Sequence, residues 1–159
     1  MIIRLTKESR THHTLEVLRN DGTSERTLLE TKSFMPHDLI HFLYERNARL
    51  HESFWGRIAT GATFASLNDR EYLTKLFQTS SELTVTESVV GPLQGFLQSG
   101  ISPQDFLERL GELFEAKREP IPAHLTINFL STIREDFRKL SGHWDSLKKG
   151  EPLELTFPD

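Results

Sequence analysis

The alternation of apolar and polar residues at both ends of the chain is the feature that most constrains its fold. Side chains of a β-strand point to opposite faces in turn, so a period of two indicates a half-buried strand. Strand character marks residues 1–6, 14–19 and 26–32, and residues 153–157 alternate in the same way. We therefore expect an N-terminal antiparallel meander of three strands, with an apolar face that needs cover. The tail strand is expected to join this sheet, because its backbone needs hydrogen-bonding partners.

The link between the second and third strands is a strong turn signal. It reads Asn20-Asp21-Gly22-Thr23, and Asn, Asp and Gly tolerate the positive φ that a tight turn requires. The two strands are therefore predicted to form a β-hairpin.

Helical spacing replaces the alternation from Pro36 onward. Pro36 suits the first position of a helix, where its missing N–H is not needed. Asn68 with Glu71 three residues later fits a start that resembles a capping box. A further helix is expected within residues 84–98, and Ser102 followed by proline predicts the start of another.

The last helix has the most regular apolar spacing, in steps of three and four, and Gly150 is expected at its C-terminal end. The seam consists of Leu130, Ile133, Phe137, Leu140, Trp144 and Leu147. We expect it to pack inside the domain against the helices that carry Phe106 and Tyr72, and the alternative is a dimer through the same seam.

These patterns predict one α+β domain over residues 1–159. The N-terminal meander of three strands and the C-terminal strand would be covered by a bundle of about five helices. The conformation of residues 51–67 stays open, because this stretch is rich in Gly and small residues and has no clear period.

Composition narrows the function classes. The chain has a formal net charge of -4 and no cysteine. The acidic balance argues against nucleic-acid and anionic-membrane partners. The absence of cysteine excludes disulfides, thiolate zinc sites and a cysteine nucleophile. With no apolar run long enough for a membrane span and no secretory leader pattern, we expect a cytoplasmic protein.

The segment with the most suggestive chemistry carries His37, His41 and Glu45 at four-residue spacing. Residues four apart share a helix face, so two imidazoles and a carboxylate could meet one divalent metal ion, such as zinc. This face lies opposite a stripe that includes Leu39 and Leu43, so we expect it to face solvent or a second surface. A solvated face with two histidines is the alternative interpretation.

The pattern His37-Asp38-x-x-His41 is similar to the H-E-x-x-H helix of zinc proteases, in which the acid between the ligands is the general base. The similarity covers five residues and departs at that acid, because Asp38 has a shorter reach than Glu. A third ligand could come from Glu45, His51 or an N-terminal histidine, and the spacing does not choose among them.

Phe54 and Trp55 are candidates for a partner-binding surface, since exposed aromatic residues often anchor protein partners. Their alternative role is in the core. The following stretch, Gly56 to Thr63, matches G-x-x-x-x-G but has Ala62 where a phosphate-binding loop has Lys. The glycines are better explained by close backbone packing.

The sequence therefore supports two hypotheses. The first is a non-enzymatic binding or adaptor module that acts through protein–protein contact, with self-association as a homodimer in view and no cofactor. The second is a metal-binding protein or metal-dependent hydrolase built on His37 and His41. Catalytic residues, if there are any, are not identified by any motif.

Overall fold

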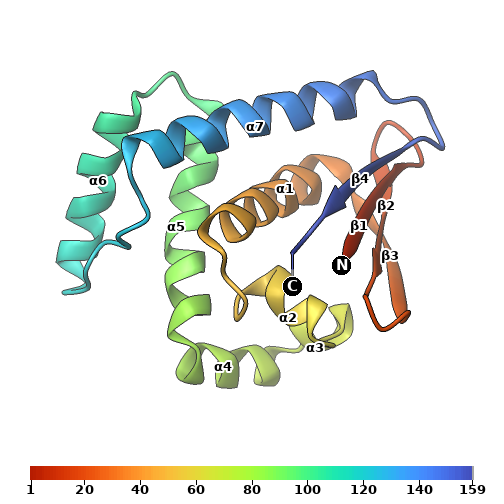
Figure 1. Ribbon diagram of the computed structural model, residues 1–159, viewed down its shortest axis with the longest axis horizontal. Helices are drawn as coiled ribbons and strands as arrows, with labels where there is room; N and C mark the ends of the chain where they lie inside the picture. Colours follow the sequence, from red (N-terminus) through yellow and green to blue (C-terminus); the bar gives the residue numbers. More distant parts are fainter. Residues whose placement is uncertain (159) are drawn as a thin grey trace.

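The computed structural model describes residues 1–158, and in this part of the chain it contains one antiparallel sheet and seven helices (Figure 1). The strands are β1 (Ile2–Lys7), β2 (His12–Leu18), β3 (Ser24–Glu30) and β4 (Pro152–Thr156). The helices are α1 (Thr31–Ala48), α2 (Phe54–Ala59), α3 (Phe64–Asn68), α4 (Arg70–Thr79), α5 (Ser81–Gln98), α6 (Pro103–Ala116) and α7 (Ile127–Ser146). The α+β class, the N-terminal meander and the C-terminal strand are confirmed.

The sheet has the strand order β3-β2-β1-β4, and every neighbouring pair is antiparallel. The tail strand β4 pairs with β1, with Leu155 opposite Ile3 and Leu153 opposite Leu5. These four side chains are buried on the inner face. On the outer face Arg4 bridges the strands by donating to carboxylates of both β2 and β4. The alternation in the sequence therefore corresponds to one buried face and one solvent-exposed face of the sheet.

The β2–β3 hairpin forms at the predicted turn. Gly22 has a φ of 85°, which side chains disfavour, and its N–H donates to the carbonyl of Arg19 at 3.0 Å. The Asp21 carboxylate accepts the Thr23 N–H at 2.9 Å and closes the loop.

Helix α1 lies in the centre of the molecule, between the sheet and the pair α5 and α7 (Figure 1). It begins at Thr31, five residues before the predicted start at Pro36. The cause is Glu30, whose side chain caps the helix by accepting the Ser33 N–H at 2.8 Å. Pro36 therefore lies inside the helix, where the carbonyl one turn earlier loses its usual donor.

The starts of helices α6 and α4 differ in how well they match the predicted positions. Helix α6 begins as predicted, with the Ser102 side chain accepting the Asp105 N–H at 3.1 Å. Helix α4 begins one residue later than predicted, because Asp69 rather than Asn68 caps it, and Asn68 closes α3. Both residue types cap helices well, so composition alone does not distinguish neighbouring positions.

Helix α7 packs against α1 and α6, and its seam residues Leu130, Ile133 and Trp144 are buried. The predicted contact with the Phe106 helix, α6, is therefore present, whereas the Tyr72 helix, α4, packs against α3 and α5. Gly150 does not end α7. It has a φ of 85° in the turn before β4, and its N–H donates to the carbonyl of Lys7 at 2.7 Å.

Among residues 1–158, no helix is long and apolar enough to cross a membrane.

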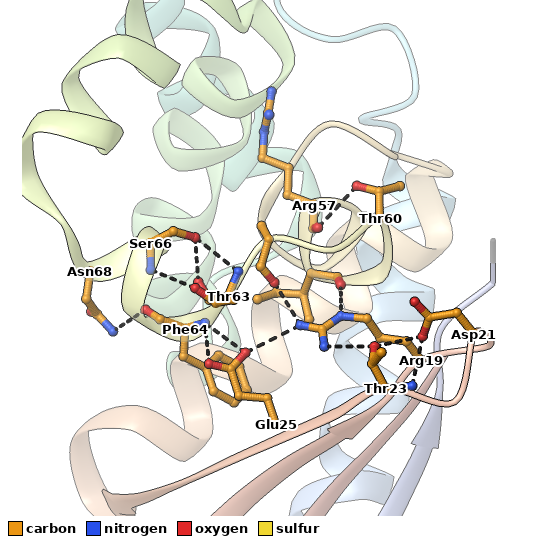
Figure 2. A network of polar contacts seen from close by, with 12 residues as sticks. Arg19, Asp21, Thr23, Glu25, Arg57, Thr60, Thr63, Phe64, Ser66 and Asn68 are labelled. Atoms are coloured by element: carbon orange, nitrogen blue, oxygen red, sulfur yellow. Dashed lines mark hydrogen bonds and ion pairs between the residues drawn. The ribbon is translucent and has the colours of Figure 1, made fainter.

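The two helices beyond the expected five, α2 and α3, lie in the stretch that the sequence left open. Gly56 in α2 packs so closely against the His51 backbone that a Cβ would clash, as predicted for close backbone packing. The same prediction is wrong for Gly61, where nothing lies within 4 Å of a Cβ and the φ of 108° explains the glycine instead. Arg19 fastens the loop between the two helices. It is 7% exposed, and it donates to the carbonyls of Ile58 at 2.6 Å and Ala62 at 2.8 Å (Figure 2).

Replacing Arg19 by methionine should test this anchor. Methionine retains a long apolar side chain but leaves two inward carbonyls without their charged donor, so we expect the free energy of unfolding to fall by about 3 kcal/mol. Urea unfolding measures the loss. The exposed Arg10→Met is the matched control and should stay within about 0.5 kcal/mol of the wild type. Equal effects of the two substitutions would contradict the anchoring role.

Candidate functional site

The face of α1 that carries His41 and Glu45 is buried, so a solvent-exposed histidine face is wrong. His41 is 3% exposed and Glu45 is 0% exposed, because α2 and α5 cover this side of the helix. The opposite face, with Leu39 and Leu43, is buried as well. A helix in the centre of a domain has no wet side, and its polar residues must find partners inside the protein.

Glu45 finds its partners at the start of α2. One carboxylate oxygen accepts the backbone N–H of Trp55 at 2.8 Å and lies 3.4 Å from that of Gly56. The other lies 3.0 Å from Nδ1 of His41. Ser53, the residue at the N-cap position of α2, makes no capping bond with its side chain, so Glu45 serves as the cap from another helix.

Burial governs the protonation of this group. It raises the pKa of Glu45 to about 8, against the lowering effect of the backbone N–H groups of Phe54, Trp55 and Gly56, and it lowers the pKa of His41. Glu87 of α5 lies 3.6 Å from Nε2 of His41, and burial raises its pKa too. Because burial disfavours charge on both partners, the contact between His41 and Glu45 is best described as a hydrogen bond that shares one proton.

The predicted metal ligands do not assemble as a ligand set. No group of three or more His, Cys, Asp or Glu side chains within residues 1–158 is arranged to hold a metal ion. His37 and His41 do lie together, with ring centroids 4.7 Å apart and planes at 72°. Glu45, however, is occupied by His41 and the α2 backbone, which leaves no carboxylate oxygen directed to a shared ion.

A cavity of about 440 Å³ opens on the other side of His37. It lies between the inner face of β2 and β3, the first turns of α1, and the short helices α2 and α3. Its walls consist of Leu15, Thr27, Leu29, Phe34, His37, Asp38, Phe54, Phe64 and Asn68. Phe34 is 47% exposed, so this part of the wall also faces solvent.

Asp38 is the unusual group in this wall. It is 9% exposed, its Oδ2 atom is buried without a hydrogen-bond partner, and no ion pair to it occurs within the described residues. Burial alone raises the pKa of its carboxyl to about 7. The Trp55 indole N–H donates to the backbone carbonyl of Asp38 at 3.2 Å and holds this part of α1 in place. A buried polar group without a partner requires an explanation, and a shifted pKa beside a cavity is typical of a functional site.

His37 shares the wall with Asp38. Burial lowers the pKa of His37, and the neighbouring His41 lowers it further, whereas a hydrogen bond with the side chain of Gln94 opposes both effects. The imidazole is therefore neutral near pH 7, with one nitrogen that donates a hydrogen bond and one that accepts.

The two aromatic candidates for partner binding lie in different environments. Trp55 is 1% exposed and packs in the core, so it is not an exposed anchor for a partner, and that prediction is wrong for this residue. Phe54 is partly buried and lines the cavity, with its ring centroid 4.9 Å from that of Trp55. Its use in binding stays a prediction.

Polar contacts from the hairpin hold the α3 wall of the cavity. Glu25 of β3 accepts the Phe64 N–H at 3.0 Å and lies 3.4 Å from Arg19, and Thr63 and Ser66 form a capping box (Figure 2). Asn68, at the end of α3, donates to the Phe64 carbonyl at 2.9 Å, which leaves its Oδ1 as an acceptor.

Comparison of the chain with protein-family models, with curated proteins and with solved structures found no match.

The raised pKa of Asp38 predicts how the free energy of unfolding depends on pH. An aspartate that titrates near 4 when unfolded and at about 7 when folded takes up a proton on folding between these values, so its contribution to stability is lost as the pH rises through this window. Asp38→Asn never charges. We expect its free energy of unfolding, relative to the wild type, to rise by about 2–3 kcal/mol between pH 5 and pH 8.

Urea unfolding of both proteins at the two pH values measures this difference. Asp145→Asn is the control, since its carboxylate is exposed, and its difference from the wild type should not change with pH. If the free energies of unfolding of Asp38→Asn and the wild type changed equally between the two pH values, the Asp38 carboxylate would be charged and partnered in the folded protein.

Proposed function

We propose that the protein is a non-enzymatic binding module that takes up a small, largely apolar ligand in the cavity between β2, β3, α1, α2 and α3. The observation that carries the proposal is the Asp38 carboxyl, buried and without a partner in a wall that is otherwise mostly apolar. Ligand sites are typically concave, with volumes of about 300–1,000 Å³, apolar walls and a few polar groups that orient the ligand.

The composition of the wall supports binding more than catalysis. Five of the nine lining residues are apolar, and the polar ones are His37, Asp38, Thr27 and Asn68. A mechanism with a serine, threonine or cysteine nucleophile needs its hydroxyl or thiol within hydrogen-bond reach of a base. No hydroxyl contacts His37 or Asp38 in the part of the chain that the structure describes, and no contact there favours a metal centre.

Filling the cavity should abolish binding. Thr27 lies on the inner side of β3, and Thr27→Phe would place a ring in the space that a ligand needs. We use tryptophol, an uncharged indole alcohol, as the probe and follow backbone amide shifts during titration. The wild type is expected to bind with a Kd of about 1 mM, as suits a fragment of this size, and Thr27→Phe at least about tenfold more weakly.

Thr27→Val is the matched control, because it keeps the shape of the side chain and its strand propensity, and its Kd should stay within about twofold. Thermal unfolding establishes that both variants are folded. Absence of saturable shifts at the cavity in the wild type, or equal binding by Thr27→Phe, contradicts the proposed site.

A second candidate function, self-association through protein–protein contact, is favoured by the edge of the sheet. Among the strands of residues 1–158, β3 pairs with β2 alone, and the Arg19 N–H closes that ladder on the Thr23 carbonyl. Hydrogen-bonded pairs alternate in antiparallel strands, so the backbone groups of Arg26 and Leu28 point away from β2. Leu28 is also 61% exposed, more than any other large apolar side chain in the described residues.

We propose that this edge pairs antiparallel with β3 of a second copy, around a two-fold axis at Leu28. In this register Leu28 faces its own copy, and Arg26 faces Glu30 of the second copy twice. Charged residues usually protect an edge strand against pairing, but here the opposite charges meet. Exposed strand edges are a common route to association between chains.

Charge reversal tests the register. Arg26→Glu would place a carboxylate opposite Glu30 of the other copy in both of these pairs, so the Kd for self-association should rise at least about tenfold. The double variant Arg26→Glu with Glu30→Arg restores the opposite charges and should restore association. Arg10→Glu makes the same charge change away from the edge and should have no effect.

Sedimentation equilibrium over a range of concentrations measures these constants. Glu30 caps α1, so circular dichroism must show that the double variant keeps its helix content. A wild type that stays monomeric at the highest concentration, or an Arg26→Glu protein that associates as well as the wild type, contradicts this interface.

A further inference from the structure

We infer that the cavity selects a ligand with a protonated amine on an apolar body, and that the Asp38 carboxylate is the counter-ion of that amine. The inference rests on the proposed ligand site and specifies the chemistry of its occupant. It follows from the polar groups that the wall offers and from those that it lacks.

The wall offers hydrogen-bond acceptors. The Asp38 carboxyl makes no hydrogen bond or ion pair within residues 1–158, and Oδ1 of Asn68 remains an acceptor because the amide nitrogen is used within α3. A ligand group that donates several hydrogen bonds satisfies both, and an ammonium has three donors and no acceptor.

The wall lacks a cation. The lining residues from β2, β3, α2 and α3 are uncharged, and on α1 the one titratable neighbour of Asp38 in the wall is His37, which burial keeps neutral near pH 7. No arginine or lysine in the described part of the chain lines the cavity. A ligand carboxylate or phosphate would therefore meet a buried acid without a compensating positive charge, which is strongly unfavourable.

The aromatic residues of the wall add to the attraction. Phe34, Phe54 and Phe64 come from three different helices and line the same space. The face of an aromatic ring attracts a cation within about 6 Å, and the attraction grows when water is excluded. The rings also provide the apolar contact that the body of the ligand requires.

Binding of such an amine is coupled to a proton. With a pKa of about 7, the Asp38 carboxyl is largely protonated at pH 5 and largely charged at pH 8. An ammonium pairs with the charged form, so the carboxyl proton passes to the buffer when the ligand binds at lower pH. The affinity for an amine should therefore fall as the pH drops from 8 to 5, whereas the affinity for an uncharged ligand should not fall in this way.

Three probes with the same indole ring and a different end group test the inference. They are tryptamine (an ammonium), tryptophol (a hydroxyl) and indole-3-propionate (a carboxylate). At pH 8 we expect tryptamine to bind the wild type at least about tenfold more tightly than tryptophol, and the carboxylate to bind most weakly. Isothermal titration in buffers of different ionisation enthalpy should show proton release with tryptamine near pH 6.

Asp38→Asn should remove the tenfold preference for tryptamine, the proton release and the pH dependence, while tryptophol still binds. Asp145→Asn makes the same change at an exposed acid outside the cavity and should keep all three. If tryptophol equals tryptamine in the wild type, or if Asp38→Asn retains the preference, the assignment of an amine is wrong and the cavity remains a ligand site. If none of the three probes binds, the proposed function itself is wrong.

Discussion

The burial of Glu45 is the interaction on which the arrangement of the helices depends. A carboxyl group in the protein interior is tolerated only when its oxygens are hydrogen-bonded, and those of Glu45 are met by His41 and the first N–H groups of α2. Helix α2 is thus fixed to α1 at its N-terminus, and the Trp55 indole fixes it again at the Asp38 carbonyl. Phe54 takes its place in the cavity wall as a consequence of these two attachments.

The elements that the sequence predicted well are those whose pattern reflects one simple environment. A strand with one wet and one dry face alternates, so the meander and the tail strand follow directly from the sequence. The start of α1 was misplaced because Pro36 is a strong local signal, whereas the true start depends on a side chain of the preceding strand, Glu30. The short helices α2 and α3 have no period of their own, since contacts from Glu45, Arg19 and Glu25 hold them in place.

The candidate site was predictable only in part. Helical spacing alone places His37 and His41 on one face, and their rings do lie together. The sequence could not show that this face is buried, because burial depends on which helices cover it. A signal was present nonetheless: residues 39–44 are apolar or aromatic at five of six positions, which is typical of a helix that is buried all round. Acids beside and within such a stretch, Asp38 and Glu45, are then expected in the interior.

The cavity persists because polar contacts, rather than packing alone, hold its walls. Protein interiors are close-packed, and an empty space normally collapses or destabilises the fold. Here Glu25 fixes α3 and Glu45 fixes α2, so neither helix can move inward without breaking hydrogen bonds to a carboxylate. The buried side chains of Arg19, Glu45 and His13 each make at least one polar contact inside the protein, and Asp38 makes none. A chain that gives the buried side chains of Arg19, Glu45 and His13 a polar partner inside the protein, and leaves Asp38 without one beside a cavity, has an acid suited to a partner from outside.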